Sequence, residues 1–157
     1  MIICTFEKGY TDKLRHVVVQ AIVEDKGKLL LLKRVDELLE IGKWSLPGGF
    51  LDHGETAAEG ILRELREEAG WQGKVISLFR INTNPHRPHE DRQNVSLEFI
   101  IKPLRQIGPP HDGSASKVAW IPLDKLPSLS RLAFDNEETI NLYLKHRRKK
   151  FSLPLVI

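Results

Sequence analysis

Three glutamates near the middle of the chain have the spacing of a divalent-metal site. Glu64, Glu67 and Glu68 are neighbours on one side of a helix, because residues three and four positions apart lie close together there. Their carboxylates would repel one another, so the stripe favours a compensating cation. Carboxylate oxygens suit magnesium or manganese, and magnesium is often held by few carboxylates together with substrate phosphates. The alternative is a solvated helix face whose charges are offset by Arg63 and Arg66.

The residues just upstream favour a phosphate group. Pro47, Gly48 and Gly49, followed by Gly54, place little steric bulk beside the expected start of the helix. Backbone amides and the helix dipole attract anions at such a start. A phosphate-binding turn joined to a metal-binding helix predicts a site for a metal-bound polyphosphate.

The helix that carries the three glutamates has clear ends. Thr56 and Glu59 have the spacing of a capping box, and Gly70 suits the left-handed residue that commonly ends a helix. The apolar residues between these ends share one broad sector, which therefore faces a core; they are Ala57, Ala58, Ile61, Leu62, Leu65 and Ala69.

Residues 49–71 resemble the Nudix box. That pattern is a glycine, a glutamate after five residues, Arg-Glu after seven more, an aliphatic residue, any residue, Glu-Glu, any residue, a glycine and a final aliphatic residue. The fixed positions are matched by Gly49, Glu55, Arg63, Glu64, Leu65, Glu67, Glu68 and Gly70. The one departure is Trp71 at the final aliphatic position, which remains apolar and affects packing more than chemistry.

The resemblance implies a fold and a reaction. The fold is an α/β domain, a Nudix-type α/β/α sandwich with a mixed β-sheet. The reaction is hydrolysis of the pyrophosphate bond of a nucleoside diphosphate linked to another group X. Water attacks phosphorus, and the products are a nucleoside monophosphate and X-phosphate. The expected cofactor is Mg²⁺, or Mn²⁺ in its place.

The resemblance also assigns roles within the box. Glu64, Glu67 and Glu68 would hold the metal, with the carbonyl of Gly49 as a further ligand. A bound metal makes its water more acidic, and Glu67 or a loop carboxylate would accept the proton. Arg63 would orient a box carboxylate, because Glu67 lies four residues further on, within ion-pair reach.

A further general base would have to come from outside the box. Many family members place an acidic residue several positions before a late tryptophan, which here is Trp120. Serine and alanine occupy those positions in this chain. The remaining candidates are Glu90, Asp91, Glu98 and Asp112.

Residues outside the glutamate stripe are expected to select the substrate, and the candidates are Arg34, Gly48, Gly49, Arg87, Arg92 and Phe134. Arg34 follows a predicted strand, where members of the resembled family often carry a basic residue near the nucleotide. Arg87 and Arg92 offer planar donors for phosphate. Their loop, 83–92, has a mobile surface loop as its alternative interpretation. Phe134 would stack on a base or pack in the core.

The favoured substrate class is ADP-ribose or another nucleotide sugar. Family members that cleave ADP-ribose tend to carry a proline about fifteen residues past the box, and Pro85 and Pro88 lie near that place. The alternative is a nucleoside triphosphate, with oxidised nucleotides included. A different class is a non-catalytic nucleotide-sensing or regulatory module, which the intact box disfavours.

Composition limits the remaining choices. The 157 residues are 41% hydrophobic, which suits the core of a single domain over 1–157. The net charge of +3 comes without a concentrated basic stripe, so nucleic acid is not an expected partner. The basic run 145–150 suits a helix C-terminus, with a nucleic-acid contact or a localisation signal as the alternative. The lone Cys4 and the short apolar runs predict a cytoplasmic protein without a membrane partner.

The rest of the chain predicts the elements around the box. Apolar and β-branched runs predict strands at 1–6, 16–23, 28–32, 74–82 and 95–101, and a late strand at Trp120. Residues 24–27 suit a hairpin turn, and the polar stretch 7–15 reads as a loop or linker. A second helix is expected over 135–149, with Asp135 as its cap. The apolar tail 151–157 would pack on the body or on another subunit, and together with the N-terminal strand it favours a homodimer.

Overall fold

The computed structural model describes the chain except for residues 1, 36–38, 90–91, 110–112 and 114. The elements in chain order are β1 Ile2–Thr5, β2 Thr11–Leu14, β3 Val17–Asp25, β4 Lys28–Arg34, β5 Trp44–Ser45, β6 Gly48–Phe50, α1 Ala57–Ala69, β7 Trp71–Asn82, β8 Val95–Gln106, β9 Ala115–Pro122, η1 Leu123–Lys125, η2 Leu129–Arg131, α2 Asn136–Arg148 and β10 Leu155–Val156.

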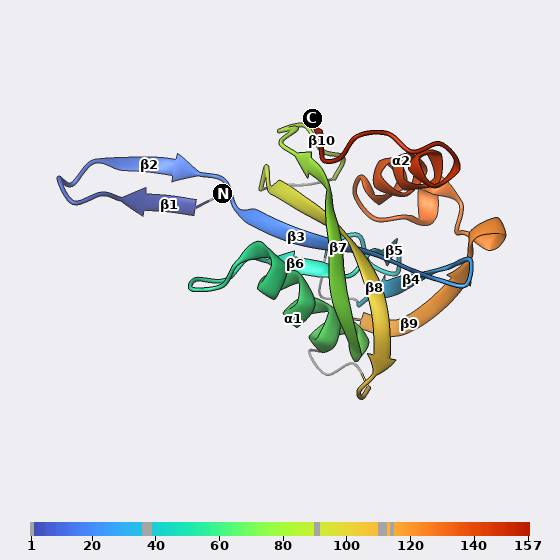
Figure 1. The fold of residues 1–157 in the computed structure, drawn as a ribbon. Coiled ribbons are helices and arrows are strands. Elements are labelled where there is room, and N and C mark those ends of the chain that lie inside the picture. The colour runs from blue at the N-terminus through green and yellow to red at the C-terminus, as the bar shows by residue number, and fades with distance from the viewer. Residues whose placement is uncertain (1, 36–38, 90–91, 110–112, 114) are drawn as a thin grey trace.

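A mixed sheet of eight strands forms the centre of the molecule (Figure 1). Its strand order is β10-β7-β8-β3-β4-β5, with β6 paired to β3 and β9 paired to β4. β3 runs parallel to β8, and β10 parallel to β7, whereas β7 and β8 are antiparallel. Helix α1 packs on one face of the sheet and α2 on the other. The predicted α/β sandwich with a mixed sheet is therefore confirmed.

Side-chain alternation divides the central strands between two cores. On β8, Phe99 packs in the cluster that contains Ile61 and Leu65 of α1, whereas Ile100 packs against the cluster that contains Ile140 of α2. Successive side chains of a strand point to opposite faces, so a strand covered on both sides needs apolar residues at consecutive positions. This explains the unbroken apolar runs at 21–23 and 29–32.

Helix α1 has the ends predicted from its sequence. The backbone N–H of Glu59 donates to the Thr56 hydroxyl at 3.3 Å, and that of Thr56 donates to the Glu59 carboxylate at 2.8 Å. Gly70 closes the helix with φ 69° and ψ 25°. Local contacts thus set the first and last residues of the helix, and with them the positions of the box side chains along it.

The N-terminus forms a hairpin that projects away from the sheet (Figure 1). Strand β2 pairs antiparallel with β1, so the prediction of a loop or linker at 7–15 is wrong for Thr11–Leu14. Two features close the hairpin. The backbone N–H of Phe6 donates to the Tyr10 carbonyl at 2.8 Å, and the rings of these two residues stack at 5.3 Å between centroids.

The C-terminal tail packs on the body. β10 pairs in parallel with the end of β7, Leu155 opposite Arg80. Of the two predicted positions for the tail, the structure shows the one against its own domain. None of the helices in the described part of the chain is long and apolar enough to cross a membrane.

Candidate active site

Arg63 lies at the centre of the box side chains. Its Nε and Nη2 donate to the Glu55 carboxylate at 3.1 and 2.8 Å. Its Nη1 donates to Glu64 at 2.9 Å and to Glu67 at 3.1 Å. Nη2 also donates to the Phe50 carbonyl at 3.0 Å. These bonds use all of the N–H groups of the guanidinium. The bond to Glu55 is the main cause of a raised pKa for Arg63 and of a lowered pKa for Glu55.

The carboxylates of the stripe also contact Gly48 and Gly49, which lie in strand β6 rather than in the turn predicted from the sequence. A Cβ on Gly49 would overlap the Glu64 carboxylate, so only glycine lets this side chain lie against β6. The backbone N–H of Gly48 donates to Glu68 Oε2 at 2.7 Å. Glu64 and Glu68 are each 9% exposed, whereas the side chain of Glu67 is 30% exposed. Buried carboxylates require charged or N–H partners, and here the Arg63 guanidinium and the backbone of β6 supply them.

The donor set has the chemistry of a hard-cation site. Among the residues that the structure describes, no group of three or more His, Cys, Asp or Glu side chains closes around a common point. Instead, Arg63 Nη1 is the shared partner of Glu64 and Glu67. Carboxylates on neighbouring helix positions are the ligands that Mg²⁺ or Mn²⁺ prefers. Glu64, Glu67 and Glu68 would hold such a cation, which would offset the mutual repulsion of their carboxylates.

Arg34 ends β4 and lines one cavity together with Gly48 and Gly49 of β6. Its Nε donates to the Leu39 carbonyl at 2.7 Å, and its guanidinium carbon lies 5.0 Å from the centre of the Phe134 ring. Burial lowers the pKa of Arg34, and the nearby Glu68 carboxylate opposes that shift. Phe134 has φ 49°, a conformation that bulky residues rarely adopt. The fold thus brings a planar cation from β4 onto an aromatic face that precedes α2.

A cavity lies beside β6, on the α2 side of the sheet. Its walls include the predicted substrate residues Arg34, Gly48, Gly49, Arg87 and Phe134, together with Gln20, Ser96 and Asn136. The cavity volume is about 100 Å³, below the roughly 300–1,000 Å³ of pockets that enclose a drug-sized ligand. It therefore fits one end of a substrate. β6 contacts the carboxylates through its glycines and lines this cavity with the same residues.

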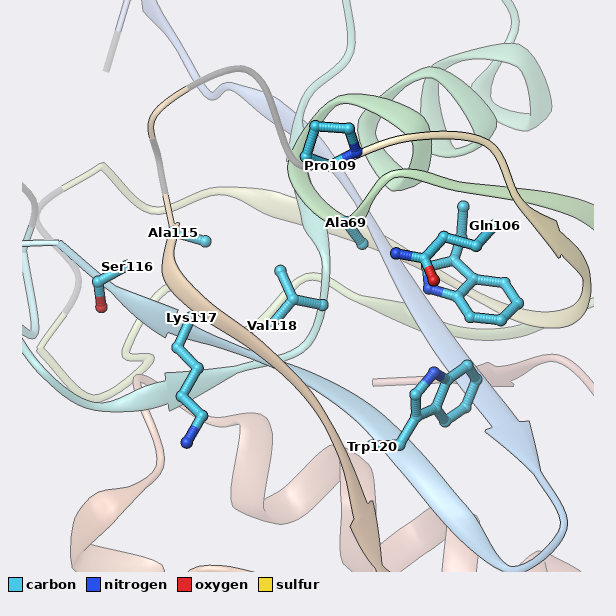
Figure 2. Close-up of a pocket in the computed structure, with 9 residues that line it drawn as sticks. Ala69, Gln106, Pro109, Ala115, Ser116, Lys117, Val118 and Trp120 are labelled. Carbon is cyan, nitrogen blue, oxygen red and sulfur yellow. The ribbon is translucent and has the colours of Figure 1, made fainter.

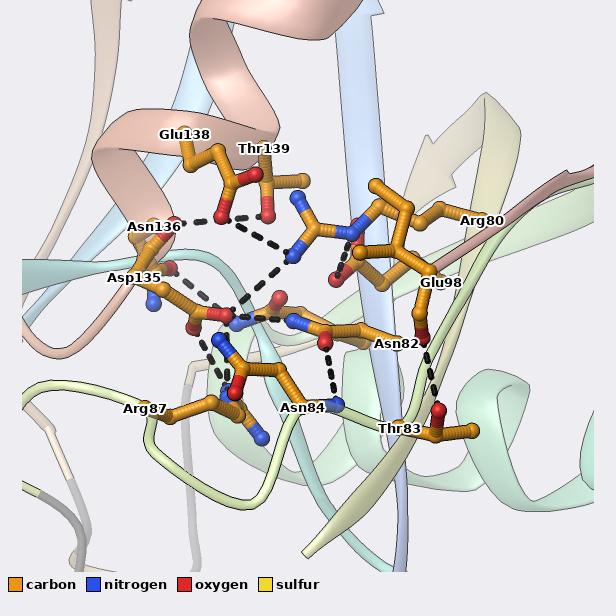
Figure 3. A network of polar contacts seen from close by, with 12 residues as sticks. Arg80, Asn82, Thr83, Asn84, Arg87, Glu98, Asp135, Asn136, Glu138 and Thr139 are labelled. Carbon is orange, nitrogen blue, oxygen red and sulfur yellow. Dashed lines mark hydrogen bonds and ion pairs between the residues drawn. The ribbon is translucent and has the colours of Figure 1, made fainter.

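Asp135 joins loop 83–92 to the start of α2 (Figure 3). It occupies the predicted cap position, but its side chain makes no capping bond. It accepts hydrogen bonds from Arg87 at 2.6 and 2.9 Å and from Asn82 at 2.6 Å. Arg80 Nη2 lies 3.3 Å from Asp135 Oδ2. Arg87 is only 7% exposed, so it braces the fold rather than extending from a mobile surface loop, and its role in binding substrate stays a prediction.

Glu98 lies on the other side of the sheet from the box carboxylates. It is fully buried on the α2 face of β8, and its Oε1 is 3.5 Å from Arg80 Nε. Burial raises the pKa of Glu98 to about 7. The sheet separates this carboxylate from the three box glutamates, so its placement does not support a role as general base.

The remaining loop candidates are only partly described. Arg92 lies over the Phe50 ring, 5.6 Å from its centre, at the outer end of β6. Glu90, Asp91 and Asp112 lie outside the described residues, so their role as general base stays a prediction.

Comparison with known proteins identifies the family. A family model described as NUDIX domain matches residues 13–143. This chain belongs to the Nudix family. It is 36% identical over 130 residues to an ADP-ribose pyrophosphatase of Methanocaldococcus jannaschii, covering 82% of this chain and 73% of that protein. It is 26% identical over 139 residues to the 8-oxo-dGDP phosphatase NUDT18 of Homo sapiens, covering 85% of this chain and 40% of that protein. The crystal structure of a NUDIX hydrolase from Nitrosomonas europaea superposes with a TM-score of 0.79 at 26% identity, covering 95% of this chain and 82% of that one.

The final box position of this Nudix pyrophosphohydrolase is a packing position. Trp71 meets Trp120 of β9 edge to face, with 5.2 Å between ring centroids. Both rings line a second cavity of about 520 Å³ between the end of α1 and the start of β9, together with Gln106 and Lys117 (Figure 2). The sequence did not predict this cavity, because its walls come from three separate stretches of the chain, 69–71, 106–109 and 115–120.

Proposed function

We propose that this protein hydrolyses the diphosphate of ADP-ribose or of another nucleotide sugar. The observation that carries the proposal is the position of β6. On one side its glycines contact the box carboxylates, and on the other they line a cavity sized for one end of a substrate. A diphosphate at this strand would lie between a metal-binding helix and a pocket for one of the two groups that the diphosphate joins. The similarity to an archaeal ADP-ribose pyrophosphatase supports this substrate class.

The metal would be Mg²⁺, with Mn²⁺ as the alternative, held by Glu64, Glu67 and Glu68 and by the carbonyl of Gly49. Once bound, the ion would neutralise charge on the phosphate oxygens and lower the pKa of a coordinated water. Within the chain, Arg63 keeps Glu64 and Glu67 side by side. Gly48 holds Glu68 through its backbone N–H group.

Glu67 is the box carboxylate best placed to accept a proton. Its side chain is 30% exposed, compared with 12% for that of Glu64, so water can reach it. Arg63 Nη1 donates to one of its oxygens and fixes its orientation. On the α2 side of β6, Arg34 would pair with a phosphate oxygen and Phe134 would offer a ring face.

The direct test is a substrate panel in the presence of Mg²⁺. ADP-ribose, UDP-glucose and nucleoside triphosphates are incubated separately, and the phosphorylated products are identified by mass spectrometry. We expect AMP and ribose 5-phosphate from ADP-ribose. Glu67→Gln should fold normally and lose activity by about 100-fold or more, the contribution of a general base. Full Mg²⁺-dependent activity in this variant would remove Glu67 from the mechanism, and equal activity in Glu64→Gln and Glu68→Gln would remove the metal site.

A second candidate is hydrolysis of nucleoside triphosphates or oxidised nucleotides. The similarity to the human 8-oxo-dGDP phosphatase favours it, although this chain covers less than half of that protein. Adding 8-oxo-dGTP and 8-oxo-dGDP to the panel separates the two candidates. Tight nucleotide binding without turnover under any metal condition would indicate a regulatory module instead.

The chain also carries a surface suited to self-association. The hairpin of β1 and β2 exposes large apolar side chains away from its own sheet: Ile2, Ile3, Phe6, Tyr10 and Leu14. We infer a homodimer that covers one face of this hairpin. The cytoplasmic location stays a prediction.

A further inference from the structure

The cavity beside β6 contains buried polar atoms that have no hydrogen-bond partner. Asn136 and Ser96 are 0% and 1% exposed, and both line the cavity. Within the described part of the chain, Asn136 Nδ2, Ser96 Oγ and Gln20 Oε1 make no hydrogen bond. Leaving a buried donor or acceptor without a hydrogen bond costs free energy, and such groups in native proteins usually have a partner. These three atoms therefore indicate a ligand with matching polar groups.

A backbone amide determines which end of the Asn136 side-chain amide is the oxygen. The N–H of Leu46 donates to Asn136 Oδ1 at 2.7 Å, and because a backbone N–H can only donate, the atom facing it must be the oxygen. Gln20 Nε2 donates to the same oxygen at 3.1 Å. The Asn136 amide thus leaves its Nδ2 donor for the ligand, and Gln20 leaves its Oε1 acceptor. Neither amide can be turned over without breaking a bond to its neighbour.

The contacts of the preceding residue hold Asn136 in place. The preceding residue, Asp135, is tied to Arg87 and Asn82 (Figure 3). These bonds replace the usual side-chain cap of α2 and hold the first turn of the helix against β7. The amide of Asn136 is thereby presented at a constant place relative to β6.

We propose that Asn136 and Gln20 select an adenine base, and this inference rests on the proposed function. Adenine N1, which carries no hydrogen, would accept from Asn136 Nδ2. The exocyclic amine would donate one N–H to Gln20 Oε1 and the other to Ser96 Oγ. Hypoxanthine, with a ring N–H and a carbonyl at these places, would set donor against donor and acceptor against acceptor. Phe134, with Arg34 on its ring, would cover the base.

The test measures binding of AMP and IMP by calorimetry with Mg²⁺ present, alongside turnover of ADP-ribose and its hypoxanthine analogue. The wild-type protein should prefer the adenine compound by about tenfold or more, the usual discrimination of a paired base edge. Asn136→Asp keeps the oxygen that Leu46 needs but replaces the donor with an acceptor, so the preference should disappear. If Asn136→Asp fails to fold, Gln20→Met provides the test. Methionine has a similar volume but lacks the acceptor, so this variant should reduce the preference.

Asn141→Asp is the matched control, because it makes the same chemical change at an exposed position of α2 and should keep the preference. Equal binding of AMP and IMP by the wild-type protein, or an unchanged preference in a folded Asn136→Asp variant, would overturn the base assignment and leave the hydrolase proposal intact. Preference for AMP without turnover of any panel substrate would overturn the proposed function and leave the base assignment intact.

Discussion

At the scale of single residues, the two glycines of β6 have different neighbours. A Cβ on Gly48 would meet the backbone of Val19 and Gln20 in the adjacent strand. The three atoms nearest to a Cβ on Gly49 would all belong to the Glu64 carboxylate, the far end of a flexible side chain. One glycine is thus needed for the fold and the other for the position of a box carboxylate. From the sequence alone both glycines were interpreted as part of a phosphate-binding turn. Their different roles were not visible there, because the residues that they contact lie in β3 and α1.

This difference predicts separate outcomes for two alanine variants. Gly49→Ala should fold but turn Glu64 away from its site, lowering activity by roughly 100-fold, as displacements of about 1 Å can, and raising the Mg²⁺ concentration needed for half-maximal rate. Gly48→Ala should instead reduce stability, because backbone cannot move as a side chain does. Mg²⁺ titration of activity and urea unfolding of both variants test the distinction. Equal stability of the two would contradict it.

A lysine cannot replace Arg63, because the planar guanidinium donates to three carboxylates at once. These belong to Glu64, Glu67 and Glu55. Arg63→Lys should lose at least two charge-assisted hydrogen bonds, worth about 1.5–3 kcal/mol each when well shielded, although the side chain is 21% exposed. We expect a fall in kcat of about tenfold or more and a lower melting temperature. Arg66→Lys is the control, since its side chain is 53% exposed and its contact with Glu67 is 4.0 Å. A similar loss in both variants would argue against a special role for Arg63.

At the scale of elements, local patterns predicted what local contacts decide. The capping box and Gly70 gave both ends of α1 because their partners lie within one turn. Asp135 was placed correctly at the start of α2, but its bonds to Arg87 and Asn82 join residues about fifty positions apart in sequence. The same limit applies to Glu98, whose chemistry depends on which face of β8 meets α2.

Burial of Glu98 predicts an unusual pH dependence of stability. Its pKa rises to about 7 in the fold, from 4.5 as the ordinary value. Between these values the folded protein keeps a proton that the unfolded chain releases, so stability should fall as pH rises. The slope approaches about 1.4 kcal/mol per pH unit for this group, or about 3 kcal/mol over the whole window.

Urea unfolding of the wild type and of Glu98→Gln between about pH 5 and pH 7 isolates this contribution. The wild type should lose stability relative to the variant across that range, because glutamine cannot titrate. Parallel pH profiles for the two proteins would show that Glu98 titrates normally. Activity should follow stability rather than the Glu98 pKa, since this carboxylate lies across the sheet from the box.

At the scale of the molecule, the sequence established the box and the sandwich but not the hairpin. The register of β1 with β2 places Ile2 opposite Leu14, and the Phe6 and Tyr10 rings stack at the same face. These four side chains are between 39% and 59% exposed. No single stretch of sequence shows this, because the apolar face appears only when the two strands pair.

An isolated two-stranded hairpin is at best marginally stable in water, so the exposed apolar face favours a partner, and a second copy of the chain is the simplest one. Light scattering should show a dimer for the full chain and a monomer after deletion of residues 1–14. Leu14→Lys should weaken association, because it places a charge on the apolar face. Ile3→Lys is the matched control, since Ile3 points to the opposite face beside Lys13, and it should leave the dimer intact. A full-length chain that stays monomeric at every concentration would end the dimer proposal, and a dimer that survives the deletion would move the interface to another surface.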